Sequence, residues 1–135
     1  MSRLLEYVYD DGGRSKYFKG QTRDCVCRAI SIVSGRDYKE VYNLIKKTMG
    51  ESPRNGVRTN TKAFESLMND LGFTYIKCYK DKLEFVDGAL PERAICYVYH
   101  HYVAVVNNVV RDTWDSRYNS FNEPRKIYGY WIYNG

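Results

Sequence analysis

The residues whose types could most directly take part in catalysis are Cys25 and Gln21, in the run Gly20–Ile30. Cys25 precedes apolar residues that recur with helical spacing, so we expect it in the first turn of a helix. A helix N-terminus carries a partial positive charge and favours a thiolate over a thiol. The amide of Gln21 can hydrogen-bond an oxyanion that forms on a carbonyl under attack. The stretch therefore predicts the nucleophile half of a cysteine hydrolase, unless Cys25 is simply a small buried residue.

The two histidines of the chain stand together, at the start of an apolar segment that runs from residue 100 to residue 106. The following Asn107-Asn108 favours a two-residue hairpin turn, because asparagine tolerates positive φ angles. With that turn, Val106 faces Val109. Successive side chains of a strand alternate between faces. One face of the predicted hairpin therefore carries His101, Val103, Val105, Val110, Asp112 and Trp114.

Burying ionisable groups such as His101 and Asp112 on this otherwise apolar face costs free energy, so their presence there indicates a specific role. In a Cys–His–Asp relay, His101 accepts the proton of Cys25, and Asp112 fixes the tautomer of His101. The alternative is that His101 and Asp112 only satisfy each other at the end of a sheet. Asp115 is a second orienting candidate, facing the other histidine if the register slips by one residue. Trp114 either covers the pair or belongs to the core.

Hydrophobic periodicity divides the chain into a helical middle and a strand-rich second half. Helical spacing predicts helices over 24–34, 37–49 and 61–71, the first capped by Thr22 or Asp24. Strand-like patterns predict strands over 4–9, 73–79, 94–99, 100–106, 109–115 and 127–133. The turn-forming residues 10–13 further predict that 16–18 pairs back on the first strand as a hairpin. We therefore expect an α+β fold in which N-terminal helices pack on an antiparallel sheet.

Length and composition predict one globular domain over residues 1–135, with 44% apolar residues. No run approaches the roughly 20 apolar residues of a membrane span, and the start lacks a signal-peptide pattern, so we expect no membrane contact and a cytosolic location. The four cysteines are expected to be free thiols, and they lack the paired spacing of a zinc site. We expect neither a metal nor a cofactor. The net charge of +5 allows weak attraction to nucleic acid, although no basic block appears.

The order of these features resembles the papain-like cysteine peptidases. A glutamine precedes a helix-opening cysteine, and a strand-borne histidine and an aspartate beside a tryptophan follow a helical middle. The chain is also similar to the bacteriocin-leader peptidases of that superfamily. Its blocks Asp24-Cys25-x-x-Arg28-Ala29, His101–Val106 and Asp112–Asp115 resemble small uncharacterised proteins encoded by phages and mobile elements.

The resemblance implies a papain-like fold and a role for each candidate residue. Cys25 would be the nucleophile, His101 the general base, Asp112 the orienting residue and Gln21 the oxyanion donor. The chain departs from the pattern of the family in that Gln21 lies closer to the cysteine and the orienting residue is Asp. Asp24, beside the thiol, would tend to raise the pKa of Cys25.

The expected function is thiol-dependent hydrolysis of a peptide or isopeptide bond, through an acyl-thioester, in a protein or peptide substrate. The first alternative is a papain-like binding module without turnover, such as a phage-encoded inhibitor of a host protein, acting in the host cytoplasm. The second is nucleic-acid binding, which the net charge of +5 and the 14 tyrosines would support. The sequence predicts no oligomeric state.

Overall fold

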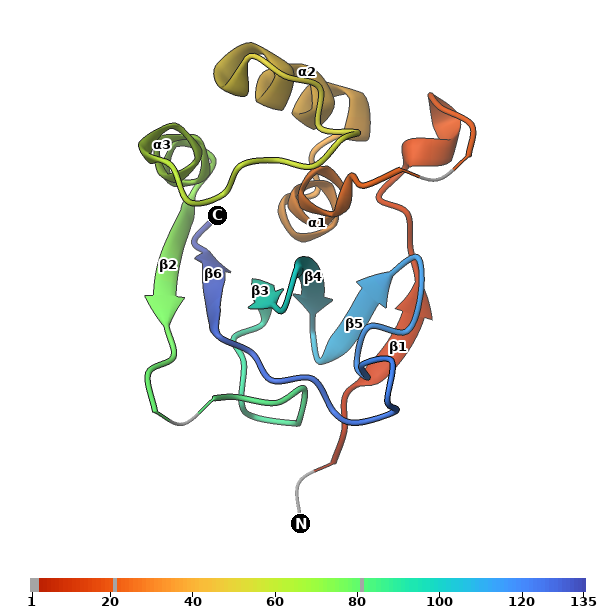
Figure 1. Cartoon of the computed structure of the whole chain (residues 1–135), viewed down its shortest axis with the longest axis vertical. Coiled ribbons are helices and arrows are strands. Elements are labelled where there is room, and N and C mark those ends of the chain that lie inside the picture. The colour runs from red at the N-terminus through yellow and green to blue at the C-terminus, as the bar shows by residue number, and fades with distance from the viewer. Residues whose placement is uncertain (1–2, 21, 81) are drawn as a thin grey trace.

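Three helices lie on one face of a six-stranded sheet in the computed structural model, which describes residues 3–20, 22–80 and 82–135 (Figure 1). The helices are α1 (Cys25–Ser34), α2 (Tyr38–Met49) and α3 (Lys62–Asp70). The strands are β1 (Glu6–Tyr9), β2 (Phe73–Lys77), β3 (Arg93–Val98), β4 (His101–Val106), β5 (Val109–Asp112) and β6 (Gly129–Tyr133). The α+β prediction is confirmed. No helix in the described part of the chain is long and apolar enough to cross a membrane.

The sheet is mixed, which corrects the prediction of an antiparallel one. Its strand order is β1-β5-β4-β3-β6-β2, and every neighbouring pair is antiparallel except β1 and β5. The predicted hairpin between residues 4–9 and 16–18 is also wrong. A short 3-10 helix, η1 (Arg14–Lys16), replaces its second strand. The physical reason is the buried Arg14 side chain, whose guanidinium donates to the backbone carbonyls of Lys19 and Gly20 and so curls the chain inward.

The predicted hairpin of β4 and β5 is confirmed in its register. Val106 pairs with Val109 and Ala104 with Arg111. Asn107 and Asn108 take φ angles of 50° and 64°, as a tight two-residue turn requires. The register places His101, the first residue of β4, and Asp112, the last of β5, together at the open end of the hairpin.

Both faces of the central strands β3 and β4 are buried, whereas the hairpin pattern alone predicts one core face. On the helix side, Tyr102 and Ala104 pack with apolar residues of the three helices. On the other side, the segments that precede β3 and β6 cross under the sheet (Figure 1). There Val103, Val105 and Val110 pack against Leu5, Phe85 and Ile127. By strand alternation His101 and Asp112 belong to the same face as Val103, Val105 and Val110, but at the end of the sheet they contact α1 instead.

Helix α1 lies over β4, and its position determines where Cys25 stands. Ala29, Ile30 and Val33 of α1 are buried in the core below the helices, and the helix ends at Gly35 with a φ angle of 76°. Such a positive φ favours glycine, as the sequence predicts. Asp24 is the N-cap residue, but its side chain makes no capping hydrogen bond. Cys25 is therefore the first helical residue, next to the open end of the β4–β5 hairpin.

The turn after β1 packs closely on α1 at Gly12. A Cβ atom at Gly12, where φ is 70°, would lie 3.0 Å from the carbonyl oxygen of Arg28. Gly50 has a similar φ of 76° but nothing within 4 Å of the same position. We expect Gly50→Ala to lower the free energy of unfolding by about 1 kcal/mol, the cost of the left-handed backbone. Gly12→Ala adds the steric clash, so we expect the free energy of unfolding to fall by roughly 2–3 kcal/mol, as measured by urea denaturation. Equal losses in the two variants would contradict this close packing.

Candidate active site

The fold brings together three of the four predicted site residues, from segments far apart in the chain. The Nε2 atom of His101 lies 2.6 Å from Oδ2 of Asp112. Because Nε2 faces Asp112, Nδ1 is the ring nitrogen left for Cys25, whose thiol interacts with the same imidazole. The fourth predicted residue, Gln21, lies outside the described residues.

The environment of Cys25 favours its thiolate. Burial by itself raises the pKa of this thiol. The interaction with the His101 imidazole, the charge of His101, the backbone N–H of Tyr102 and the charge of Arg28 outweigh burial and lower the pKa below its ordinary value. Burial also opposes the charged form of His101, but the hydrogen bond with Asp112 and the interaction with the thiol of Cys25 raise its pKa to about 9. The two shifts together favour a thiolate–imidazolium pair over the neutral thiol and imidazole.

Asp112 is fixed by contacts from several directions. Its Oδ1 atom accepts from the backbone N–H of Thr113 at 2.7 Å and from the guanidinium of Arg28 at 3.3 Å. Burial alone would raise the pKa of Asp112, but the hydrogen bond with His101 and the one from Thr113 lower it. Asp115, the alternative orienting residue, pairs instead with Arg117 at 2.8 Å. Asp112 is therefore the carboxylate that orients the imidazole.

The backbone of Asp112 is held by the first strand. Its carbonyl oxygen accepts one hydrogen bond from the hydroxyl of Tyr7 at 3.1 Å and another from the backbone N–H of Asp10 at 3.0 Å. β1 itself runs parallel to β5 in the register that pairs Tyr9 with Asp112. The strand thus supports the orienting residue from the edge of the sheet.

A buried ionic cluster behind the site was not predicted. The carboxylate of Asp24, which is 0% exposed, is bound by the guanidinium groups of Arg28 and Arg14 and by the hydroxyl of Tyr38. Arg28 also reaches Asp112, so it joins this cluster to the candidate triad. The one sequence signal for the cluster is the i,i+4 spacing of Asp24 and Arg28.

This cluster corrects the expectation that Asp24 would tend to raise the pKa of Cys25. Two arginines compensate the charge of Asp24, and the pKa of Cys25 is lowered rather than raised. Asp24 is buried and its side chain makes no bond to the helix N-terminus. Its role is therefore structural rather than capping.

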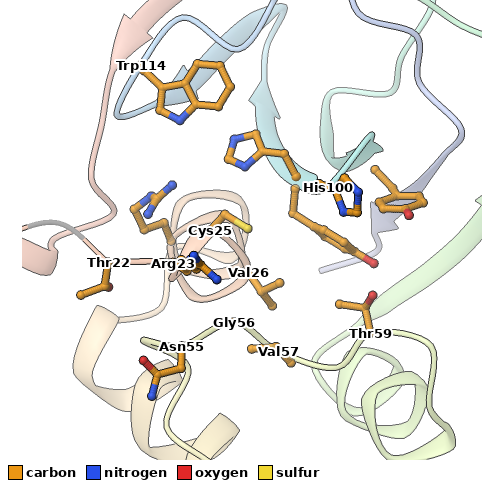
Figure 2. A pocket seen from close by; sticks show the side chains of 14 residues that line it. Thr22, Arg23, Cys25, Val26, Asn55, Gly56, Val57, Thr59, His100 and Trp114 are labelled. Atoms are coloured by element: carbon orange, nitrogen blue, oxygen red, sulfur yellow. The ribbon is translucent and has the colours of Figure 1, made fainter. Parts of the chain in front are cut away.

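A cavity of about 490 Å³ opens beside Cys25. Figure 2 shows Cys25 with Trp114 on one side and the segment Asn55–Val57 on the other. That segment is tied to the start of α1, because the N–H of Arg23 donates to the carbonyl of Arg54 at 3.0 Å. The other lining residues are Thr22, Arg23, Val26, Arg28, Thr59, Tyr97, His100, His101 and Tyr102. The site is thus open to a ligand that reaches the thiol.

Trp114 lies against the candidate base without being part of the core. Its ring centroid is 4.9 Å from that of His101, with an angle of 31° between the ring planes. The side chain is 42% exposed, so it shields one face of the imidazole while it remains accessible from solvent. Of the two sequence interpretations of Trp114, the structure favours the partial cover.

The remaining cysteines are packing residues. Cys27, Cys78 and Cys96 are buried, whereas Cys25 is half-buried. Burial raises the pKa of Cys27 to about 12, and it also raises the pKa of Cys96. Within residues 3–20, 22–80 and 82–135, no group of three or more His, Cys, Asp or Glu side chains is placed to hold a metal ion.

A scan against protein-family models, a search of curated proteins and a search of solved structures each find no match for this chain. The interpretation of the site therefore rests on its own geometry: a helix-borne thiol, an imidazole beside it, and a carboxylate that holds the imidazole.

Proposed function

We propose that the protein is a thiol-dependent hydrolase with a papain-like arrangement, which cleaves a peptide or isopeptide bond in a protein or peptide substrate. The observation that carries the proposal is the position of His101 between the thiol of Cys25 and the carboxylate of Asp112. A nucleophile, a base within its reach and a third group that orients the base are the parts that covalent acyl transfer needs.

In the first half of the proposed reaction, the thiolate of Cys25 attacks the carbonyl carbon of the scissile bond. The imidazolium of His101 then donates its proton to the leaving amine as the C–N bond breaks, which leaves an acyl-thioester on Cys25. Asp112 stabilises the imidazolium in this step. In the second half, His101 removes a proton from water, the resulting hydroxide attacks the thioester, and Cys25 leaves as the thiolate.

The start of α1 offers donors for the oxyanion of each tetrahedral intermediate. The first backbone bond of α1 runs from the N–H of Arg28 to the carbonyl of Asp24, so the N–H groups of Cys25 and Val26 come before the helical ladder. The side chain of Asp24 caps neither of them. These N–H groups, with the amide of Gln21 as predicted, are the proposed oxyanion donors.

Two further features support hydrolysis. The cavity beside Cys25 gives a carbonyl access to the thiol, and Trp114 screens one face of the imidazole from water. Lower polarity around a charged pair strengthens its electrostatic interactions. The helix-borne thiol and strand-borne imidazole also match the arrangement that the resemblance to papain-like peptidases implies.

The proposal is tested by acylation with p-nitrophenyl acetate followed by intact-mass and peptide mapping. We expect acetylation at Cys25 at least about tenfold faster than at Cys27, Cys78 or Cys96, because the other thiols are buried and two of them have raised pKa values. We also expect the acetyl group to leave Cys25 again, so that p-nitrophenol forms over many turnovers.

A Cys27→Ala variant is the control, since it removes a cysteine of the same helix. It should retain both acetylation at Cys25 and turnover. Slow, uniform acetylation of all four cysteines would contradict the proposal. Stable acetylation of Cys25 without release would instead favour a scaffold that has lost turnover, as in the binding-module alternative.

A further inference from the structure

We propose that the cavity beside Cys25 continues into a second cavity, and that the two form one groove for an extended polypeptide rich in aromatic and acidic side chains. The inference rests on the proposed hydrolase function, because it names the substrate class of that site. The argument uses a second cavity of about 430 Å³, its exposed aromatic residues and the charges along both cavities.

The second cavity exposes large aromatic side chains to solvent. Phe121 is 80% exposed and Tyr99 is 69% exposed, and Tyr128 is exposed as well. The cavity is lined by Tyr99, Asn119, Ser120, Phe121, Pro124, Arg125, Lys126 and Tyr128. Large aromatic side chains that are exposed around one hollow are typical of a binding surface.

Two contacts join this cavity to the one beside Cys25. The guanidinium carbon of Arg125 lies 5.2 Å from the ring centroid of Trp114. The rings of Tyr97 and Tyr128 lie 6.0 Å apart. In each pair, one residue lines the first cavity and the other lines the second. The two hollows therefore share a wall of aromatic side chains that leads from the thiol toward Phe121.

The charges along the groove favour an acidic ligand. The residues that line the two cavities include no Asp or Glu in the described part of the chain. Arg23 beside the first cavity and Arg125 beside the second have no carboxylate within ion-pair distance among the described residues. A carboxylate of the ligand can pair with either guanidinium while aromatic rings stack on the wall.

A single-stranded nucleic acid fits the groove less well, although aromatic and basic residues also bind nucleic acids. Binding of such a strand needs a groove of positive charge that follows the phosphates. Lys126 is already paired with Glu84 at 3.3 Å, so the second cavity retains Arg125 as the cation without a carboxylate partner among the described residues. Two such cations in the described part of the whole groove, Arg23 and Arg125, suit side-chain carboxylates better than a row of phosphates.

The test uses the Cys25→Ala variant as a target that binds substrate without cleaving it. A phage-displayed library of random peptides is selected on this variant, and the enriched sequences are compared with the input library. We expect enrichment of Asp or Glu together with Phe, Tyr or Trp. The affinity of a selected peptide, measured by fluorescence polarisation, should fall by about tenfold when Phe121→Ser and Arg125→Glu are added.

Lys47→Glu is the control for the charge change, because Lys47 is exposed on α2 and lies in neither cavity. It should leave the affinity of the peptide unchanged, and circular dichroism should show that each variant is folded. No enrichment, enrichment of basic peptides, or binding that survives the Phe121→Ser and Arg125→Glu changes would overturn the inference. Tighter binding of an oligothymidylate than of any selected peptide would also overturn it.

The outcome is separable from that of the proposed function, because acetylation of Cys25 by p-nitrophenyl acetate does not require the groove. Selective acetylation and turnover with failed peptide selection would overturn the groove alone. A peptide preference that depends on Phe121 and Arg125, without selective acetylation, would overturn hydrolysis alone.

Discussion

His101→Ala should lower the steady-state turnover of p-nitrophenyl acetate by roughly 10²–10⁴-fold, the range that removal of a general acid–base group produces. The same variant should alkylate at Cys25 up to about 30-fold more slowly at pH 7, since a thiol of ordinary pKa is only a few per cent ionised there. The physical reason is that the interaction with His101 and the charge of His101 are the largest effects that oppose burial and lower the pKa of Cys25. Iodoacetamide labelling followed by peptide mapping measures the alkylation rate directly.

The neighbouring histidine gives a matched control for that experiment. His100 is exposed, and it is not among the groups that lower the pKa of Cys25. His100→Ala should therefore leave the alkylation rate close to that of the unmodified protein. Equal loss of reactivity in the two variants would contradict the assignment of His101 as the base.

The pH dependence of the same reaction follows from the two pKa shifts. The pKa of Cys25 is lowered, so alkylation should remain fast at a pH where an ordinary thiol is protonated. The pKa of His101 is raised to about 9 from an ordinary value of 6.5. The imidazolium thus stabilises the folded state fully below pH 6.5, and this contribution is lost as the pH rises toward 9. Turnover of an amide substrate should fall only as the pH rises through about 9, because in the proposed mechanism the imidazolium of the folded protein donates a proton to the leaving amine.

Asp24→Asn should lower the free energy of unfolding by about 3–5 kcal/mol, as expected when one partner of a buried ion pair is removed. The substitution leaves Arg14 and Arg28 buried, at 6% and 7% exposure, without the carboxylate that lies between them. Equilibrium denaturation in urea measures the loss. Because Arg28 also contacts Asp112, the alkylation of Cys25 should slow as well.

A second ion pair with the same spacing serves as the control. Arg36 and Glu40 form an i,i+4 pair at 2.8 Å in which both side chains are exposed. Water screens such a pair, so Glu40→Gln should change the free energy of unfolding by less than about 0.5 kcal/mol. A small effect of Asp24→Asn, comparable to that of Glu40→Gln, would contradict a structural role for the buried cluster.

The local parts of this fold could be predicted from the sequence. Helical spacing, with a glycine after the last residue of each helix, predicts α1 and α2. Asn107-Asn108 predicts the hairpin together with its register. The register in turn predicts that His101 and Asp112 share a face, and the two side chains do meet. Each of these inferences needs only residues that are close in sequence, where backbone geometry limits the possible arrangements.

The parts that depend on distant residues could not be predicted. The parallel pairing of β1 with β5 joins two segments that lie far apart in the sequence. Nothing in either strand indicates its partner. The inward turn of Arg14 likewise depends on Asp24 and Tyr38, whereas the local sequence of residues 16–18 alone predicts a strand. Charged residues are rarely buried without partners, and the partners are visible only in the folded chain.

The pairing of β1 with β5 and the docking of α1 on β4 also bear on the order in which the protein forms during synthesis. The helix that carries Cys25 leaves the ribosome before the hairpin that carries His101 and Asp112, and β1 must wait for β5. The hairpin can close by itself because its loop is short, whereas the contact with Cys25 closes a long one. We therefore expect a nascent chain to hold an ordinary thiol until the β4–β5 hairpin is made. The reactivity of Cys25 would then report the docking of α1 on the β4–β5 hairpin rather than the formation of the helix alone.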